Sequence, residues 1–548
     1  MANPVLIAVL LLPLGVFVSS LWGVFRNYRA ARTIGLPIII LPISLTNLLW
    51  MMLVRHVMPL LERLPFGSGY FTRFCYTGWE FKDKSRAHVE FGDAFTSVTP
   101  GKNWVYLCNA DAVTEIIRRE RQGEFARPVE MLAMLDVFGP NLSTVHGKDW
   151  QRQRKCTTAT FNEHNNALVW DESRRQAHQM LEYWMSAGES GTRTTADDVR
   201  TLALDVLLFA GFGKSFDFKG SKTKEKSTGP LSYRDALALI LENAVPILAI
   251  GPKVLQRLSF VPGLGRLGQA TIEFKQYMVD MLEENKHATD IQGTQANLLT
   301  SLVRAAVVDK QLSEDEVFGN MFVFNFAGHD TTAHTLAFTF VLLAVYPEVQ
   351  DWMAEEINNV VNNNGSEQLS YDLFASFPRT LAILLETVRL FDPLLSLVKV
   401  SESRPQTLTI GDKDHTLPTG TQVLLNLNAL QTHPKYWGDD GHDWRPSRWI
   451  KAGSVDGQEE LITPVKGSYL PWGEGLRACP GKKFAQVEHV AVMVAIFREH
   501  CVAPVKLAGE DDAAAKKRTL DVVNDAGMVL LLQMFHPEKA ALQWRKRV

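Results

Sequence analysis

A single cysteine lies in a glycine-rich loop near the C-terminal end of the chain. The loop covers residues 471–481 (PWGEGLRACPG), and residues 482–494 predict a helix directly after it. Backbone N–H groups at a helix start stabilise a thiolate over a thiol, and glycines let the backbone approach a flat ligand closely. A cysteine thiolate is one of the few ligands by which proteins hold haem iron, and it favours cleavage of the O–O bond. Cys479 is therefore a candidate iron ligand, although a lone cysteine near a helix start is more often a small buried apolar residue.

A second group of polar residues lies inside a long apolar helix. Ser313 and Glu316 have the spacing of a capping box, and the apolar pattern runs from there to about residue 346. A helix of this length extends about 45–50 Å. Its middle reads AGHDTT, at positions 327–332. Asp and Thr are poor helix formers, so stability alone does not explain this run, and chemistry is the better hypothesis.

Two further pairs have helical spacing. Trp150 and Arg154 are four residues apart and share one helix face, where an indole N–H and a guanidinium suit a buried carboxylate. Glu386 and Arg389 lie among apolar residues, and Arg448 further along the chain can complete an ion-pair triad. Taken alone, the first pair is common on amphipathic helices, and the second is more often a surface salt bridge worth less than about 1 kcal/mol.

Along the chain the four motifs come at residues 150–154, 327–332, 386–389 and 471–481. In this order they resemble those of the cytochrome P-450 family, and the resemblance extends from about residue 65 onward. The resemblance implies a mainly α fold with a small β-sheet subdomain and haem b as the cofactor, with Cys479 as the axial iron ligand. It implies that Thr331 hydrogen-bonds bound dioxygen, that Asp330 relays protons and that Gly328 opens the helix against the haem. The triad Glu386–Arg389–Arg448 would be structural. The cofactor-binding positions that the resemblance implies are Trp150, Arg154, Ala327, Gly328, Lys399, Trp472, Gly475, Arg477, Cys479 and Gly481.

Three positions depart from the usual family pattern. Asp392 stands where the first proline of an aromatic-Pro-Pro run is usual, and Trp472 replaces a phenylalanine near the sulfur. Lys399 occupies a position where an arginine or histidine commonly reaches a haem propionate, and a lysine lacks the bidentate fork of arginine. The last two changes leave haem binding in place but leave the reduction potential open.

The N-terminal part of the chain predicts a membrane anchor. Residues 4–25 carry no charge, and about 20 such residues span a bilayer. Arg26, Arg29 and Arg32 follow, which predicts that the rest of the chain is cytosolic. We expect residues 1–25 to form an uncleaved transmembrane helix and residues 65–548 to form the catalytic domain.

Residues 26–64 are expected to link the anchor to the catalytic domain. They contain a second uncharged run at 34–54, for which we favour a re-entrant or surface-lying segment over a second crossing. Two glycosylation sequons, at Asn141 and Asn364, would be used only if the catalytic domain lay on the lumenal side.

The composition excludes some classes of function. A formal net charge of −3 gives no reason to expect nucleic acid as a partner. Five scattered cysteines without a C-x-x-C motif suit a reducing compartment.

The resemblance implies a monooxygenase of the endoplasmic reticulum membrane that inserts one oxygen atom of O2 into a lipophilic small molecule. Hydroxylation or epoxidation in a fungal biosynthetic pathway is expected, with electrons from NADPH through a separate cytochrome P-450 reductase and with cytochrome b5 as a second candidate donor. Arg477, Lys482 and Lys483 are weak candidates for the docking surface. The alternatives are a haem-dependent isomerase or dehydratase that works without O2, and a non-catalytic membrane haem-binding protein. The acid–alcohol pair Asp330–Thr331 favours oxygen activation over both.

Overall fold

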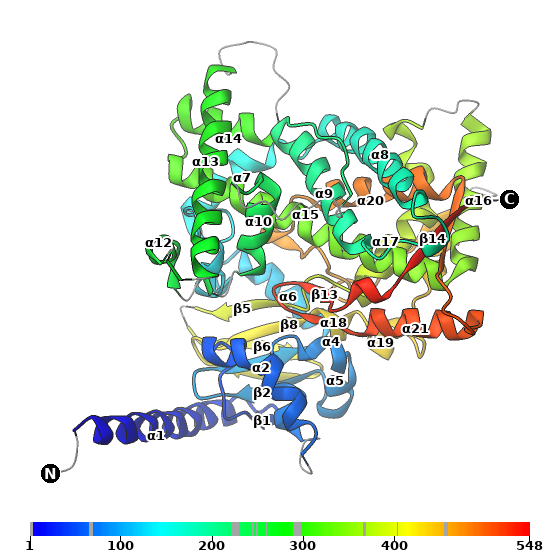
Figure 1. Ribbon diagram of the computed structural model, residues 1–548. Coiled ribbons are helices and arrows are strands. Elements are labelled where there is room, and N and C mark those ends of the chain that lie inside the picture. Colours follow the sequence, from blue (N-terminus) through cyan, green and yellow to red (C-terminus); the bar gives the residue numbers. More distant parts are fainter. Residues whose placement is uncertain are drawn as a thin grey trace.

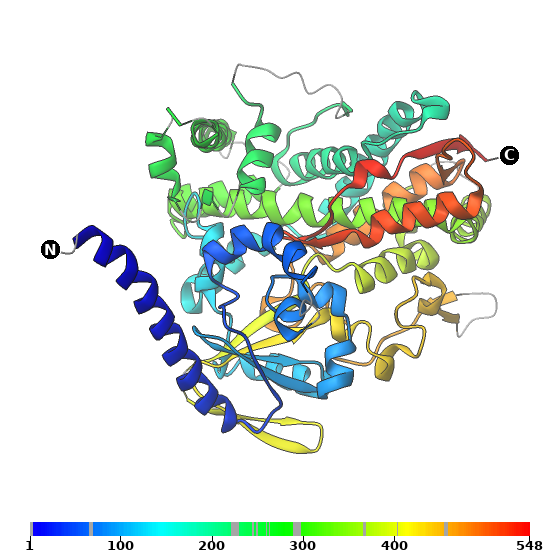
Figure 2. The ribbon, with the colours of Figure 1, turned by 60° about the horizontal axis from the view of Figure 1, so that its bottom comes forward.

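One long helix, α15 (Glu314–Val345), runs through the middle of the protein, and most other helices pack around it (Figure 2). The predicted capping box is present, because the Ser313 hydroxyl accepts a hydrogen bond from the Glu316 N–H (3.2 Å) and the Glu316 carboxylate accepts one from the Ser313 N–H (2.9 Å). The next helix, α16, begins at Pro347. Nearly every residue of α15 is buried, so the helix forms the centre of the core.

The computed structural model describes residues 4–547 except 65–68, 221–229, 244–245, 248–249, 259, 262, 289–296, 365–368, 403 and 454–458. The helices, labelled in Figure 1, are α1 (Pro4–Arg32), α2 (Leu48–Leu61), α3 (Tyr70–Phe74), α4 (Trp79–Asp83), α5 (Arg86–Phe91), α6 (Ala110–Glu120), α7 (Gly147–Thr158), α8 (Glu163–Met185), α9 (Thr195–Phe212), α10 (Tyr233–Glu242), α12 (Pro252–Arg257), α13 (Leu264–Ala288), α14 (Leu298–Val307), α15, α16 (Pro347–Asn364), α17 (Pro378–Leu390), α18 (Leu427–Leu430), α19 (Pro434–Trp437), α20 (Lys482–Phe497) and α21 (Asp512–Asn524).

The strands lie mainly to one side of the helices (Figure 1). Six of them form one sheet in the order β1-β2-β3-β8-β5-β4, and the others form two-stranded pairs. Their bounds are β1 (Ile38–Ile40), β2 (Ala94–Val98), β3 (Asn103–Leu107), β4 (Phe125–Ala126), β5 (Ser396–Ser401), β6 (Gln406–Ile410), β7 (Lys413–Leu417), β8 (Gln422–Asn426), β9 (Ile450–Ala452), β10 (Glu459–Leu461), β11 (His500–Pro504), β12 (Ala526–Met528), β13 (Leu532–Met534) and β14 (Leu542–Lys546). The predicted fold class, mainly α with small sheets, is confirmed.

The run at residues 34–54 contains strand β1 and the first half of helix α2. The strand β1 pairs in parallel with β2, with Ile38 opposite Thr96, so part of this run belongs to the six-stranded sheet. The helix α2 follows, capped by the Asn47 side chain, which accepts a hydrogen bond from the Trp50 N–H. A run of uncharged residues does not distinguish a membrane segment from a buried strand followed by a helix. The predicted boundary at residue 65 lies outside the described residues, but the sheet already begins at residue 38.

Within the described part of the chain, no helix taken singly has both the length and the apolar character needed to cross a membrane. One bent pair, α15 with α16, has them in combination, at an angle of 107° between the two helices. Because α15 is buried in the core, its apolar character is explained by packing within the protein.

Candidate active site

The cysteine loop holds the thiol group at the start of α20. The Cys479 N–H donates a hydrogen bond to the Trp472 carbonyl (2.8 Å), and the Gly481 N–H points to the sulfur. Gly475 has φ +76°, and a Cβ there would lie 2.7 Å from Ile117, so this loop conformation requires glycine. Cys479 is exposed as a residue, but burial of its sulfur raises the pKa of the thiol, and the Gly481 N–H and Arg154 oppose that rise. A positively charged iron at the sulfur would supply the missing stabilisation of the thiolate.

The middle of α15 has one accessible face. Ala327 is exposed and Thr331 is half-buried, although the residues around them on the helix are mostly buried. The Thr331 hydroxyl donates to the Ala327 carbonyl at 2.9 Å. This face therefore adjoins open space, and the hydroxyl lies at its edge.

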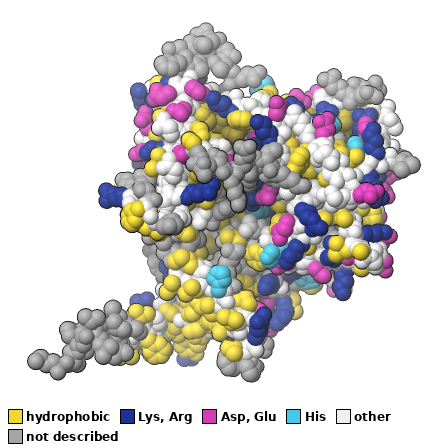
Figure 3. All heavy atoms as spheres, viewed as in Figure 1, with side chains coloured by type: hydrophobic (Ala, Val, Ile, Leu, Met, Phe, Trp, Pro, Cys, Tyr) yellow, Lys and Arg dark blue, Asp and Glu magenta, His cyan; other side chains and the backbone are white. Residues whose placement is uncertain are grey.

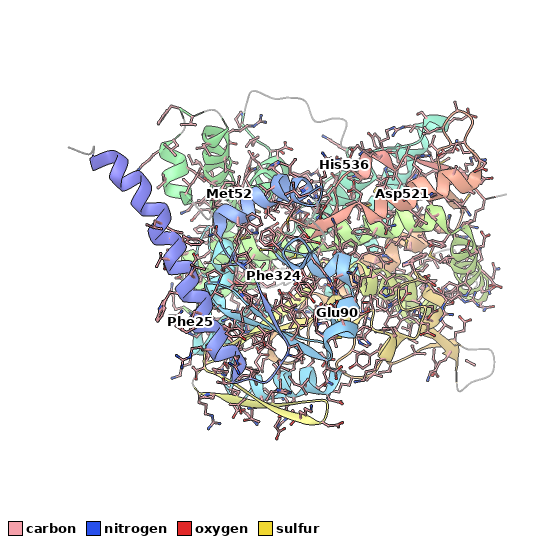
Figure 4. All side chains as sticks on the ribbon, turned by 90° about the horizontal axis from the view of Figure 1, so that it is seen from below. Phe25, Met52, Glu90, Phe324, Asp521 and His536 are labelled. Atoms are coloured by element: carbon pink, nitrogen blue, oxygen red, sulfur yellow. The ribbon has the colours of Figure 1, made fainter. Side chains whose placement is uncertain are left out.

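Phe161 connects this part of α15 to the cysteine loop. Its ring centroid lies 5.9 Å from that of Phe324, one turn before Ala327, and its Cε1 is 3.8 Å from the Cβ position of Gly481. The label in Figure 4 places Phe324 in the interior of the protein. The structure thus brings two sequence motifs that are about 150 residues apart into one region.

Gly328 lies where helix α9 approaches α15 closely. A Cβ at this position would lie 3.0 Å from the Cδ1 and Cδ2 atoms of Leu207 in α9. The glycine therefore allows α9 to pack closely against α15. Asp330, two residues after Gly328, also contacts α9.

Asp330 forms an ion pair with Arg200 of α9, whose Nε lies 3.1 Å from the carboxylate. His334, one turn further along α15, lies 3.6 Å from the same oxygen. Burial raises the pKa of Asp330, but His334, His329 and Arg200 outweigh this effect and hold the pKa below its ordinary value. Burial lowers the pKa of His334 to about 4, so this imidazole is neutral near pH 7. Arg200 also lies 3.7 Å from Asp197, which is more than half exposed, and so links Asp330 to the surface.

The Glu386–Arg389–Arg448 triad is present as ion pairs. Arg389 Nε lies 2.7 Å and Arg448 Nε 2.8 Å from the Glu386 carboxylate. Arg389 and Glu386 are completely buried. Arg389 also donates to the carbonyls of Gln431 and Gly441, so the triad ties α17 to the loop that precedes the cysteine region.

Comparison with known proteins identifies the family. The cytochrome P450 family pattern matches residues 73–524. A cytochrome P450 monooxygenase of Penicillium rubens, prx9, is 30% identical over 98% of this chain and 99% of its own. The phomenoic acid biosynthesis cluster cytochrome P450 monooxygenase of Leptosphaeria maculans is 30% identical over 88% of this chain and 89% of its own. This chain belongs to the cytochrome P450 family. It is an oxidoreductase, and its relatives are named as monooxygenases.

Solved structures agree on the fold. A crystal structure of a cytochrome P450 (CYP102L1) matches with a TM-score of 0.65 at 18% identity, and it covers 85% of this chain and 98% of its own. The haem domain of cytochrome P450DA matches with a TM-score of 0.64 at 20% identity over 85% of this chain and 92% of its own. At these identities the likeness concerns the fold alone.

The P450 family implies haem, and the charges of this chain fit it. Three half-buried arginines lie beside the cysteine loop: Arg154, which donates to the Ala478 carbonyl (3.0 Å), Arg477, which donates to the Leu142 and Val145 carbonyls, and Arg127. Burial lowers the pKa of all three, that of Arg477 to about 10. The carboxylate that acts on this group is Glu120, and it already pairs with Lys399. Cations that are partly removed from water favour anionic partners, and the two propionates of haem would supply them.

Lys399, one of the positions expected to bind the cofactor, forms an ion pair within the protein. Its ammonium group lies 2.7 Å from Glu120 of α6, and both side chains are buried. Arg127, in contrast, did not stand out in the sequence. The available signal was an Arg-Pro dipeptide in the irregular segment before Trp150, and its approach to Arg477 depends on the pairing of β4 with β5. Trp150 itself is buried, and its ring lies 4.5 Å from the Arg477 guanidinium.

Asp392 shows how this P450 accommodates its departure from the proline pattern. The carboxyl is completely buried and accepts hydrogen bonds from the Leu394 N–H (3.0 Å) and the Gln431 amide (3.2 Å). Burial raises its pKa to about 8, so the group is mostly neutral near pH 7. The side chain thus holds the turn after α17 through hydrogen bonds, where proline would hold it through ring stiffness.

Proposed function

We propose that this cytochrome P450 inserts one oxygen atom of O2 into a lipophilic small molecule, by hydroxylation or epoxidation, with electrons from NADPH through a separate reductase. The observation that carries this proposal is the pair Asp330–Thr331 on α15, a carboxylate tied to the surface by Arg200 and a hydroxyl on the accessible face. When bound, haem supplies the iron centre for reducing and cleaving O2, and thiolate ligation favours that cleavage.

The residues of the chain have separate tasks in this proposal. Cys479 holds the iron, and Arg127, Arg154 and Arg477 hold the propionates. The carboxylate of Asp330 acts as a proton acceptor inside the protein, because its low pKa keeps it ionised. The Thr331 hydroxyl donates a proton at the accessible face of α15. It then regains a proton that reaches it through Asp330. An enzyme that rearranged its substrate without O2 would not need this route.

Removing the Thr331 hydroxyl tests the proton route. We expect Thr331→Ala to retain haem and substrate binding, to lower product formed per NADPH oxidised by about 10-fold and to release hydrogen peroxide instead. The measurement is the ratio of product to NADPH consumed in membranes that contain a reductase.

Thr332→Ala is the matched control for this test. Its hydroxyl is buried and hydrogen-bonds to the Gly328 carbonyl (3.3 Å), so its loss should leave the ratio unchanged. Asp330→Asn should slow turnover and leave the peroxide yield closer to that of the wild type. An unchanged ratio in Thr331→Ala would move the isomerase alternative forward, particularly if a peroxide substrate were converted without NADPH.

A biosynthetic substrate is proposed on two grounds. The relative from Leptosphaeria maculans is named for a phomenoic acid biosynthesis cluster. By analogy with the family, residues 122–145, 394–398 and 524–528 lie near the substrate, and together these segments are mostly apolar. These grounds support a lipophilic metabolite as the substrate class.

The redox partner is proposed to be a cytochrome P450 reductase, with cytochrome b5 as a second donor. Of the three basic residues expected at the docking surface, only Lys482 is exposed. Arg477 points inward to backbone carbonyls, and Lys483 lies 3.7 Å from the Phe374 ring. The docking surface therefore includes at most one of these three cations.

We place the protein at the endoplasmic reticulum membrane, with α1 as the anchor and the catalytic domain in the cytosol. The support is the uncharged run in α1 and the three arginines at its C-terminal end. Figure 3 shows hydrophobic side chains gathered beside α1 on the lower part of the protein. In the elements next to α1 along the chain, β1 and α2, the exposed apolar residues include Ile40, Leu49, Met52, Leu53 and Leu60.

Glycosylation tests this topology. Asn141 is completely buried and donates to the Leu135 carbonyl, so it cannot be an acceptor in the folded protein. Asn364 is exposed at the end of α16, while Gly365 and Ser366 of its sequon lie outside the described residues. We expect Asn364 to carry no glycan in membranes of expressing cells, and a glycan there would place the domain in the lumen.

A further inference from the structure

The C-terminal half of α1 is held against the six-stranded sheet by buried polar contacts. The Asn27 side chain is buried and donates hydrogen bonds to the carbonyls of Thr99 (2.8 Å) and Pro100 (3.3 Å). The Asn103 side chain donates in return to the Asn27 carbonyl (2.9 Å). All three partners lie in the turn between β2 and β3 or at its edge, so one helix position is fixed by three hydrogen bonds.

Small residues extend this contact along one face of α1. A Cβ at Gly23 would lie 2.3 Å from the Pro100 carbonyl oxygen, so the helix and the turn touch backbone to backbone. Ala31 is completely buried. Gly23, Asn27 and Ala31 are spaced four residues apart and therefore share one face. Only a short connection joins Arg32, the last residue of α1, to strand β1 of the sheet. This connection also restrains the C-terminal end of α1.

The opposite face of α1 is apolar and exposed. Figure 4 shows Phe25 on the side of the helix that is turned away from the sheet, and Met52 on α2. The exposed apolar residues on this side of α1 include Leu14, Val18, Leu21, Trp22 and Phe25. An apolar face of this size needs a partner that covers it.

We propose that α1 and the catalytic domain form one rigid body, so that the anchor sets the tilt of the domain on a lipid bilayer. This inference rests on the proposed membrane location and adds the orientation to it. An anchor on a flexible linker would leave the tilt free. Here Asn27 and Gly23 join the helix to the sheet. The apolar surface of α1 and α2 lies on lipid, so the angle between the catalytic domain and the bilayer is fixed.

A distance measurement tests the rigid body. Spin labels are placed at Val18 on α1 and at Asp412, an exposed residue in the turn between β6 and β7, in the haem-loaded protein in lipid nanodiscs. We expect a narrow distance distribution by double electron–electron resonance. Gly23→Leu should broaden it by on the order of 10 Å, the spread of a flexible linker of a few residues.

Gly15→Leu is the matched control, since a Cβ at Gly15 has no neighbour within 4 Å. It adds the same side chain to the same helix and should leave the distribution narrow. Asn27→Leu should broaden the distribution as Gly23→Leu does, and the ferrous–CO spectrum shows that each variant is folded. A broad distribution in the wild type, or a narrow one in both Gly23→Leu and Asn27→Leu, would overturn the rigid body.

Flotation with liposomes separates this result from the membrane proposal. If the wild type does not float, the membrane location fails, and the orientation proposed here fails with it. If the wild type and all variants float, the distance distributions alone decide whether α1 is rigidly held.

Discussion

Glu386→Gln is expected to abolish the accumulation of haem-containing enzyme. The Glu386 carboxylate accepts hydrogen bonds from Arg389, Arg448, the Trp449 indole N–H (2.9 Å) and the Arg445 N–H (2.9 Å). Glutamine has the same shape but no charge, so it leaves the completely buried Arg389 without its counter-ion. Breaking such a buried pair costs about 3–5 kcal/mol, a large share of a typical stability of about 5–15 kcal/mol.

The measurement is the amount of ferrous–CO-absorbing protein relative to total protein after expression. Glu355→Gln is the matched control, because Glu355 pairs with Arg379 (2.6 Å) but is 63% exposed, and such surface pairs contribute at most about 1 kcal/mol. We expect wild-type haem content in this control. If Glu386→Gln accumulated haem as the control does, the triad would not be required to hold α17 against the loop that precedes the cysteine region.

The motifs that could be predicted from the sequence are those whose geometry is local. The capping box of α15 and the Glu386–Arg389 pair each involve residues three positions apart on one helix, and the helix itself sets their distance. The β2–β3 hairpin follows from two apolar runs around a short turn. These features are present because no distant element is needed to form them.

Other features of the site depend on residues that are distant in the sequence. Lys399 has the sequence position of a propionate ligand, and its ammonium group forms an ion pair with Glu120 of α6. Gly328 lies in the expected motif, but Leu207 of α9 occupies the space beside its Cα. Arg127 joins the cations beside the cysteine loop only through the pairing of β4 with β5. Each outcome is decided by tertiary packing, which local spacing does not contain.

The N-terminal region was ambiguous for a different reason. An uncharged stretch predicts burial but does not say whether lipid or protein covers it. Strand β1 is covered by protein, because its backbone pairs with β2. The two faces of α1 differ, with Asn27 and Gly23 toward the sheet and apolar side chains outward.

Cys479→Ala is expected to remove the thiolate from the haem site completely. Alanine cannot bind iron, and no other cysteine lies in the loop at 471–481. Arg127, Arg154 and Arg477 remain, so some haem can still bind, and the loss of the ligand is read from the spectrum. Cys156→Ala is the control, because Cys156 is only half-buried and lies on α7 with its sulfur near Gln311.

The ferrous–CO absorption spectrum of these two variants tests the central claim most directly. The red-shifted band of thiolate-ligated haem should be present in the wild type and in Cys156→Ala and absent in Cys479→Ala. A Cys479→Ala protein that kept this band would contradict the assignment of Cys479 as the iron ligand, and with it the proposed oxygen chemistry.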